Sequence, residues 1–127
     1  MIAADTNILV RLLVNDVPEQ AEVIRKMIKN GEWLYINSVV LSELFWVLTK
    51  VYGYPKNDFI ASIDVLLESE GIHFFNAEIV KNVLSDFVQT KIGFVDCLIN
   101  EINSSNGFKT LTFDKKAAKL DGMVLLN

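Results

Sequence analysis

MIAADTNILVRLLV (residues 1–14) decides the fold. Met1–Asp5 is a short apolar run that ends in an acid, and its length predicts a buried strand. The apolar residues of Asn7–Val14 then recur at helical spacing. A short strand that passes directly into a helix is the beginning of an α/β arrangement, and the rest of the chain repeats it.

Short apolar runs alternate with longer helical patterns along the whole sequence. Further strands are predicted at 33–36, 72–75, 110–113 and 123–126. Helices are predicted at 17–30, 38–52, 58–69, 77–90, 94–105 and 115–120. Strands separated by helices imply parallel pairing through crossovers. We therefore predict an α/β fold, a Rossmann-like α/β/α sandwich with a parallel sheet, formed by a single domain over residues 1–127.

Residues that begin helices support these boundaries. Asp16 is expected to cap the second helix, with Pro18 in its first turn. Asn37 or Ser38 is expected to cap the third helix, and Asn76 a later one. In parallel sheets of this kind, binding sites lie beyond the carboxyl ends of the strands. The residues that directly follow strands are therefore the first candidates for function.

Composition excludes several classes of protein. The net charge of −4 argues against a uniformly basic surface that binds nucleic acid. The lone cysteine, Cys97, excludes an internal disulfide and a multi-cysteine zinc site. The lone histidine, His73, excludes RNA cleavage by a histidine pair. We see no signal peptide in the N-terminal MIAADTN and no apolar run of the roughly 20 residues that a membrane span needs, so we expect a cytoplasmic protein.

Four acids occur among apolar residues: Asp5, Glu43, Asp96 and Asp114. A buried carboxylate is costly without a partner, and no Lys or Arg is an immediate neighbour of the first three. A shared divalent cation is the simplest partner. Carboxylate oxygens suit Mg²⁺ or Mn²⁺ better than zinc.

Each acid also has a local interpretation that needs no metal. Asp5 is a good N-cap, Asp96 lies where it stabilises a helix dipole, and Asp114 can cap the short helix after it. Glu43 lies a full turn into a helix that is apolar on almost every side, so no such local role explains it. That residue favours the metal interpretation.

Four short motifs together resemble a PIN-domain ribonuclease: Asp5-Thr6-Asn7, Ser42-Glu43-Leu44, Phe94-Val95-Asp96-Cys97-Leu98-Ile99 and Thr112-Phe113-Asp114. The resemblance covers the whole chain. Small members of this kind resemble the toxin halves of VapBC toxin–antitoxin pairs.

The resemblance implies a Mg²⁺- or Mn²⁺-dependent endoribonuclease, a homodimer, and a cognate antitoxin that lies in a groove beside the active site. Asp5, Glu43 and Asp96 would ligate the metal, and Asp114 would reach it through water. Thr6 and Thr112 match hydroxyl positions that orient acids or hold water. Asn100 is one turn after Asp96, so we expect it to face the same cleft.

RNA binding requires local positive charge. Lys115, Lys116 and Lys119 follow Asp114 and could contact a phosphate backbone, as could Arg11 after Asp5; solvated helix faces are the alternative interpretation. Trp46 and Phe94 could stack on bases, but packing in the core is the preferred interpretation. The rival function is a catalytically silent binding module for RNA or protein on the same fold. A receiver domain is disfavoured because the chain lacks an early acidic pair and a late Lys-Pro, and a haloacid-type phosphatase because Asn7 stands where its second Asp would be needed.

Overall fold

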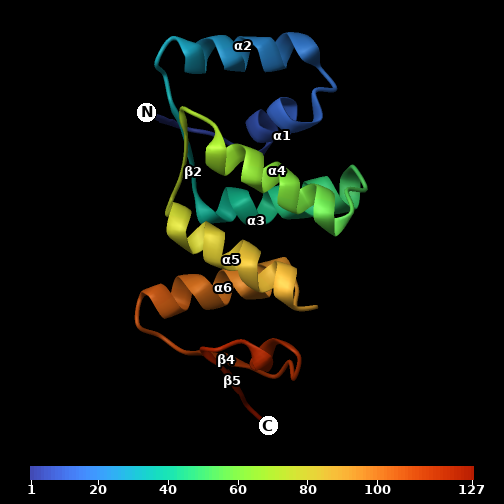
Figure 1. Ribbon diagram of the computed structural model, residues 1–127, viewed down its shortest axis with the longest axis vertical. Helices are drawn as coiled ribbons and strands as arrows, with labels where there is room; N and C mark the ends of the chain where they lie inside the picture. The colour runs from blue at the N-terminus through green and yellow to red at the C-terminus, as the bar shows by residue number, and fades with distance from the viewer. The chain divides into compact units, whose positions relative to one another are not determined.

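Three strands of the chain pass into helices whose first turns are capped by an Asp or Asn side chain. β1 (Ile2–Ala3) is followed by α1 (Thr6–Val14), β2 (Leu34–Ile36) by α3 (Ser38–Trp46), and β3 (Ile72–Phe74) by α5 (Ala77–Gln89) (Figure 1). The caps are Asp5 on the Ile8 amide at 3.1 Å, Asn37 on the Val40 amide at 2.8 Å and Asn76 on the Ile79 amide at 3.0 Å. Each cap satisfies an amide that the helix itself leaves unpaired.

The structure, a computed structural model, describes residues 1–127. It consists of two compact units, Met1–Phe75 and Asn76–Asn127. The single-domain organisation remains a prediction.

The first unit contains a three-stranded parallel sheet in the order β1-β2-β3. The connection from β1 to β2 contains α1 and α2 (Pro18–Lys29). The connection from β2 to β3 contains α3, the π-helical turn η1 (Val47–Val51) and α4 (Lys56–Glu68). The prediction that the first strand is buried is wrong: Ile2 is 51% exposed because β1 is an edge strand that pairs only with β2.

Apolar side chains from the strands and helices form the core of the first unit. Its fully buried members include Leu9, Val10, Ile36, Leu41, Leu44, Leu48, Phe59 and Ile63. Phe45 packs edge-to-face on Phe59, with ring centroids 5.0 Å apart, and so connects α3 to α4. This core holds the carboxyl ends of β1 and β2 in place, where Asp5 and Asn37 follow.

The second unit is built on the helix pair α5 and α6 (Phe94–Ser105), which pack against each other. Phe87 and Phe94 meet edge-to-face with centroids 5.5 Å apart. After α6, β4 (Thr110–Thr112) and β5 (Met123–Leu125) pair in parallel, joined by the 3₁₀ turn η2 (Ala117–Lys119). Asp114 lies just after β4, at the start of this connection.

The predicted alternation of strands and helices is confirmed: the chain has an α/β fold with parallel strands and flanking helices. The single helix predicted over 38–52 is wrong in detail, because α3 ends at Trp46 and continues as the π-helical turn η1. Thr49 contributes to this change of helix type, since its hydroxyl donates to the Phe45 carbonyl at 2.7 Å. Side-chain bonds of this kind bend helices.

The prediction that Asp16 caps α2 is also wrong. Val17 occupies the cap position, and no side chain caps this helix. Asp16 instead accepts a hydrogen bond from Arg11 at 3.1 Å and another from the Tyr52 hydroxyl at 3.1 Å. The carboxylate therefore connects the end of α1 to the residue after η1.

We predict that Gly71→Ala destabilises the protein far more than Gly53→Ala. Both glycines have a left-handed backbone conformation, with φ of +81° and +70°. An alanine in this conformation destabilises the folded state by about 1–2 kcal/mol. A Cβ at Gly71 would also lie 2.6 Å from Ile28 Cγ2 and 2.8 Å from Trp33 Cδ1, whereas nothing lies within 4 Å at Gly53. Overpacking adds about 1–3 kcal/mol. Urea unfolding of both variants measures the difference, and equal losses of stability would contradict the packing at Gly71.

Candidate functional site

Asp5 lies between β1 and α1 with an exposed side chain. Its Oδ1 accepts the Ile8 amide at 3.1 Å, which leaves the second carboxylate oxygen for another ligand. The adjacent Thr6 is buried, at 4% exposure. The predicted role of Asp5 as an N-cap is confirmed, and this cap fixes where the carboxylate stands.

Glu43 is exposed on α3, so the prediction that it sits in apolar surroundings is wrong. The helix turns Leu41 and Leu44 into the core of the first unit, and Glu43 lies on the outward stripe. Val39 and Trp46, at 70% and 58% exposure, share that stripe at the spacing of one helical turn. Trp46 is therefore not a core residue, contrary to the preferred interpretation of the sequence.

Asp96 lies in the first turn of α6, where the positive end of the helix dipole favours a carboxylate. Its side chain is half-buried, and its Oδ2 lies 3.8 Å from the position that a Cβ would take on Gly93. Phe94 and Cys97 on either side are fully buried, as predicted for core residues. The buried neighbours hold the first turn of α6, and with it the backbone of Asp96.

Asp114 follows β4 and is held by backbone amides. Its Oδ1 accepts from the amides of Lys116 at 2.8 Å and Ala117 at 3.3 Å. The helix predicted over 115–120 is wrong in extent, because only the 3₁₀ turn Ala117–Lys119 forms, and the position that caps this turn is Lys116. Thr112 assists, since its hydroxyl oxygen accepts from the Asp114 amide at 3.0 Å. The Asp114 carboxylate is exposed and oriented before any ligand binds.

The four acids are divided between the two units, Asp5 and Glu43 in the first and Asp96 and Asp114 in the second. No group of three His, Cys, Asp or Glu side chains placed to hold a metal ion occurs in the structure. None of the four forms an ion pair within its own unit. Carboxylate oxygens without basic partners are a donor type that suits hard divalent cations.

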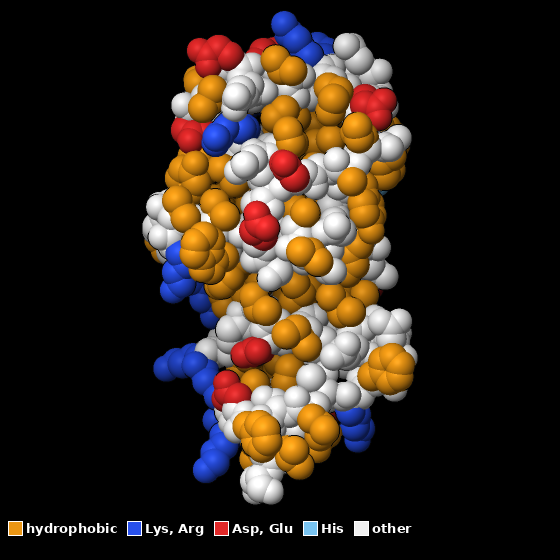
Figure 2. All heavy atoms as spheres, turned by 180° about the vertical axis from the view of Figure 1, so that it is seen from behind, with side chains coloured by type: hydrophobic (Ala, Val, Ile, Leu, Met, Phe, Trp, Pro, Cys, Tyr) orange, Lys and Arg blue, Asp and Glu red, His pale blue; other side chains and the backbone are white.

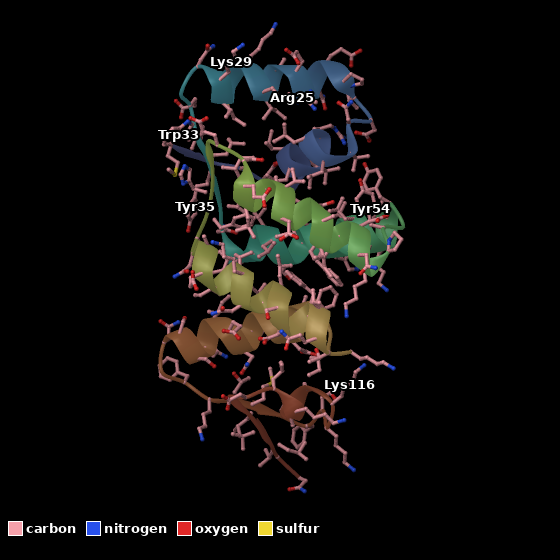
Figure 3. The ribbon with its side chains drawn as sticks, in the orientation of Figure 1. Arg25, Lys29, Trp33, Tyr35, Tyr54 and Lys116 are labelled. Carbon is pink, nitrogen blue, oxygen red and sulfur yellow. The ribbon has the colours of Figure 1, made fainter.

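The predicted RNA-contacting residues differ in how they are held. Arg11 is engaged within the first unit, because its guanidinium donates to Asp16 at 3.1 Å and to Gln20 at 2.8 Å. Lys115, Lys116 and Lys119 are all exposed, and none of the three forms an ion pair within the second unit; Lys116 is labelled in Figure 3. The lysines are therefore better placed than Arg11 to contact a phosphate backbone.

Two cavities lie in the first unit. One, of about 450 Å³, lies between α1 and α2 near Asp5, with Asn7, Ile8, Arg11, Gln20, Val23 and Ile24 as its lining. The other, of about 590 Å³, is largely apolar, lies near the start of β2 and carries Arg25, Lys29 and Trp33 (Figure 3). Of these two cavities, the one between α1 and α2 is lined by a residue of the predicted site, Arg11.

The second unit has a cavity of about 380 Å³ that the sequence patterns did not reveal. Asp86 of α5 and Glu101 of α6 both line it. Burial, followed by a hydrogen bond to Asp86 and repulsion from its charge, raises the pKa of Glu101 to about 7. No spacing motif marks this pair, because two separate helices bring the acids together.

Asn100 lines the same cavity and is only 2% exposed. Its Nδ2 donates to the Asp121 carbonyl at 2.8 Å, so the side chain connects α6 to the loop before β5. The predicted supporting role of Asn100 beside Asp96 stays a prediction.

Comparison with known proteins identifies the family. The family model described as PIN domain matches residues 2–123, so the chain belongs to the PIN domain family. No curated protein sequence matches the chain. Among solved structures, the chain is similar to VapC20 of Mycobacterium tuberculosis, described as a toxin that cleaves the sarcin–ricin loop, at 15% identity over 94% of each chain with a TM-score of 0.42. None of the helices is long and apolar enough to cross a membrane.

Proposed function

We propose that this PIN-domain chain is a metal-dependent endoribonuclease and the toxin of a type II toxin–antitoxin pair. The observation that supports the proposal is the set of four carboxylates, Asp5, Glu43, Asp96 and Asp114, which have no ion pair within their units. Two of them, Asp5 and Asp114, are oriented by backbone amides. The experiment that tests it is incubation of the purified chain with RNA and Mg²⁺.

When bound, a pair of Mg²⁺ or Mn²⁺ ions supplies an activated water and neutralises charge on the scissile phosphate. In the proposal, Asp5, Glu43 and Asp96 bind the cations directly. Asp114, held by Thr112, orients a water ligand. Lys115, Lys116 and Lys119 bind the RNA backbone, Thr6 and Asn100 support the acids, and Arg11 contributes only after its pairing with Asp16 is broken.

We predict that Asp5→Asn, Glu43→Gln and Asp96→Asn each lower the rate of RNA cleavage by about 100-fold or more. Mutation of a residue that only supports a metal ligand already lowers metal affinity or activity by about 10–100-fold, so loss of a ligand should cost at least as much. Asparagine is the right replacement at Asp5 because it keeps the cap on Ile8. Initial rates on a labelled RNA, at equal concentrations of folded protein by circular dichroism, give the measurement.

Asp64→Asn is the matched control, since it removes one exposed carboxylate from α4 outside the proposed site. It should cleave at the wild-type rate. A site variant that keeps wild-type activity removes its residue from the site, and an inactive wild-type chain favours the silent binding module.

We predict that cleavage requires Mg²⁺ or Mn²⁺, stops with EDTA, and leaves 5′-phosphate and 3′-hydroxyl ends. The reason is that water attacks the phosphate, so the ribose 2′-hydroxyl takes no part. A substrate with one 2′-deoxy residue before the cut should therefore still be cleaved. A cyclic phosphate product from RNA, together with binding but no cleavage of the deoxy substrate, would contradict this mechanism.

We propose that the antitoxin docks in the cavity between α1 and α2, because it lies near Asp5 and exposes apolar surface. Val23 lines it and is 68% exposed. An antitoxin Arg or Lys could then neutralise the acids, since a guanidinium pairs well with carboxylates. We also propose a homodimer, supported by exposed apolar side chains such as Val39 and Trp46; Figure 2 shows such apolar surface on one face.

We predict that Val23→Asp weakens binding of the antitoxin encoded by the adjacent gene by at least about tenfold, the effect of losing roughly 1.4 kcal/mol, and leaves RNA cleavage unchanged. Val65→Asp on α4, at 57% exposure, is the matched control and should bind normally. Calorimetry gives the affinity, and light scattering of the free chain at micromolar concentration tests the dimer. Equal affinity of both variants would place the antitoxin elsewhere.

A further inference from the structure

We propose that the cavity of about 380 Å³ in the second unit binds a hard divalent cation, held by the carboxylates of Asp86 and Glu101 and the side-chain oxygen of Asn100. This inference does not depend on the proposed nuclease function. Asp96, in the first turn of α6, does not line the cavity, which lies further along the helix.

The buried side chain of Asn100 has one oxygen that lacks a partner. Its Nδ2 donates to the Asp121 carbonyl at 2.8 Å, and this bond fixes which way the amide faces. Its Oδ1 is buried and has no hydrogen-bond partner. Leaving such an oxygen unpaired is unfavourable, and a cation in the cavity would give it a partner.

Asp86 and Glu101 line the same cavity from two helices, α5 and α6. Burial, followed by a side-chain hydrogen bond to Asp86 and repulsion from its charge, raises the pKa of Glu101 to about 7. A divalent cation between the two side chains would offset this repulsion.

Gly122 lets the loop backbone lie close to these oxygens. A Cβ at this position would lie 2.8 Å from Asn100 Oδ1 and 2.8 Å from Ser104 Oγ. Any larger residue would therefore clash with both oxygens and displace them. The positive φ of Gly122, +103°, brings the loop backbone past α6 without a side chain in the way.

The chemistry of the lining selects the ligand. Asp86, Asn100, Glu101, Ser104 and Asp121 offer oxygen donors, and no Lys or Arg lines the cavity. Carboxylate, amide and hydroxyl oxygens are ligands for hard cations, with water completing the shell. A bound cation would join α5, α6 and the loop before β5.

The test uses Mn²⁺ as a paramagnetic probe on the full-length chain carrying Asp5→Asn and Asp96→Asn, which removes two of the acids of the proposed nuclease site. In amide NMR spectra, micromolar to millimolar Mn²⁺ should broaden the signals of Glu101 and Gly122 selectively. Glu101→Gln is then added to that background. The glutamine can still form a hydrogen bond to Asp86 but carries no charge, so this variant should fold and should bind Mn²⁺ about tenfold or more weakly. Asp86→Asn is a second variant with the same expectation.

Glu78→Gln is the matched control, because it removes an exposed carboxylate from the first turn of α5 outside the cavity. It should bind Mn²⁺ as the background does. Absence of broadening at millimolar Mn²⁺, or broadening in the Glu101→Gln and Asp86→Asn variants equal to that of the background, would overturn the cation site. Neither outcome bears on RNA cleavage, which is measured on the wild-type chain.

Discussion

The first turn of a helix exposes backbone amides that need acceptors, and this requirement selects the residue that caps the helix after each of the first three strands. Asp5, Asn37 and Asn76 each accept the amide three residues later. The two asparagines show that a neutral side chain is enough for the cap. The negative charge of Asp5 is therefore more than the cap needs, although the helix dipole tolerates it well. A cap that also presents a free carboxylate oxygen is a suitable first ligand for a cation.

The sequence predicted the fold well where local chemistry decides it. A short apolar run followed by Asn37 or Asn76 marks a strand end and a helix start together, and both caps are found. One failure depends on a distant residue. Asp16 is recruited by Tyr52, 36 residues further along the chain, and so does not cap α2. The π-helical turn η1 was missed for a local reason, because the bond from the Thr49 hydroxyl to the Phe45 carbonyl cannot be read from residue types that also suit an α-helix.

The candidate site shows a similar division. The positions of Asp5 and Asp114 follow from strand ends and turn chemistry, and the structure shows both acids oriented by amides. Glu43 could not be placed by counting apolar neighbours. A helix can turn only one stripe toward the core, and on α3 that stripe contains Leu41 and Leu44. The neighbours that made Glu43 look buried include Trp46, which faces outward with it.

The acids of this chain therefore differ in how they are held before a ligand arrives. Backbone amides fix Asp5 and Asp114, whereas Glu43 projects from a helix without an ion-pair partner in its unit. At Glu101, burial, a hydrogen bond to Asp86 and repulsion from the Asp86 charge raise the pKa. Fixed carboxylates lose little entropy when they bind a cation, whereas a free Glu side chain loses rotamer freedom. If these acids bind a cation as proposed, Asp5 and Asp114 are each oriented for it in advance by their own amides, while Glu43 would lose rotamer freedom on binding.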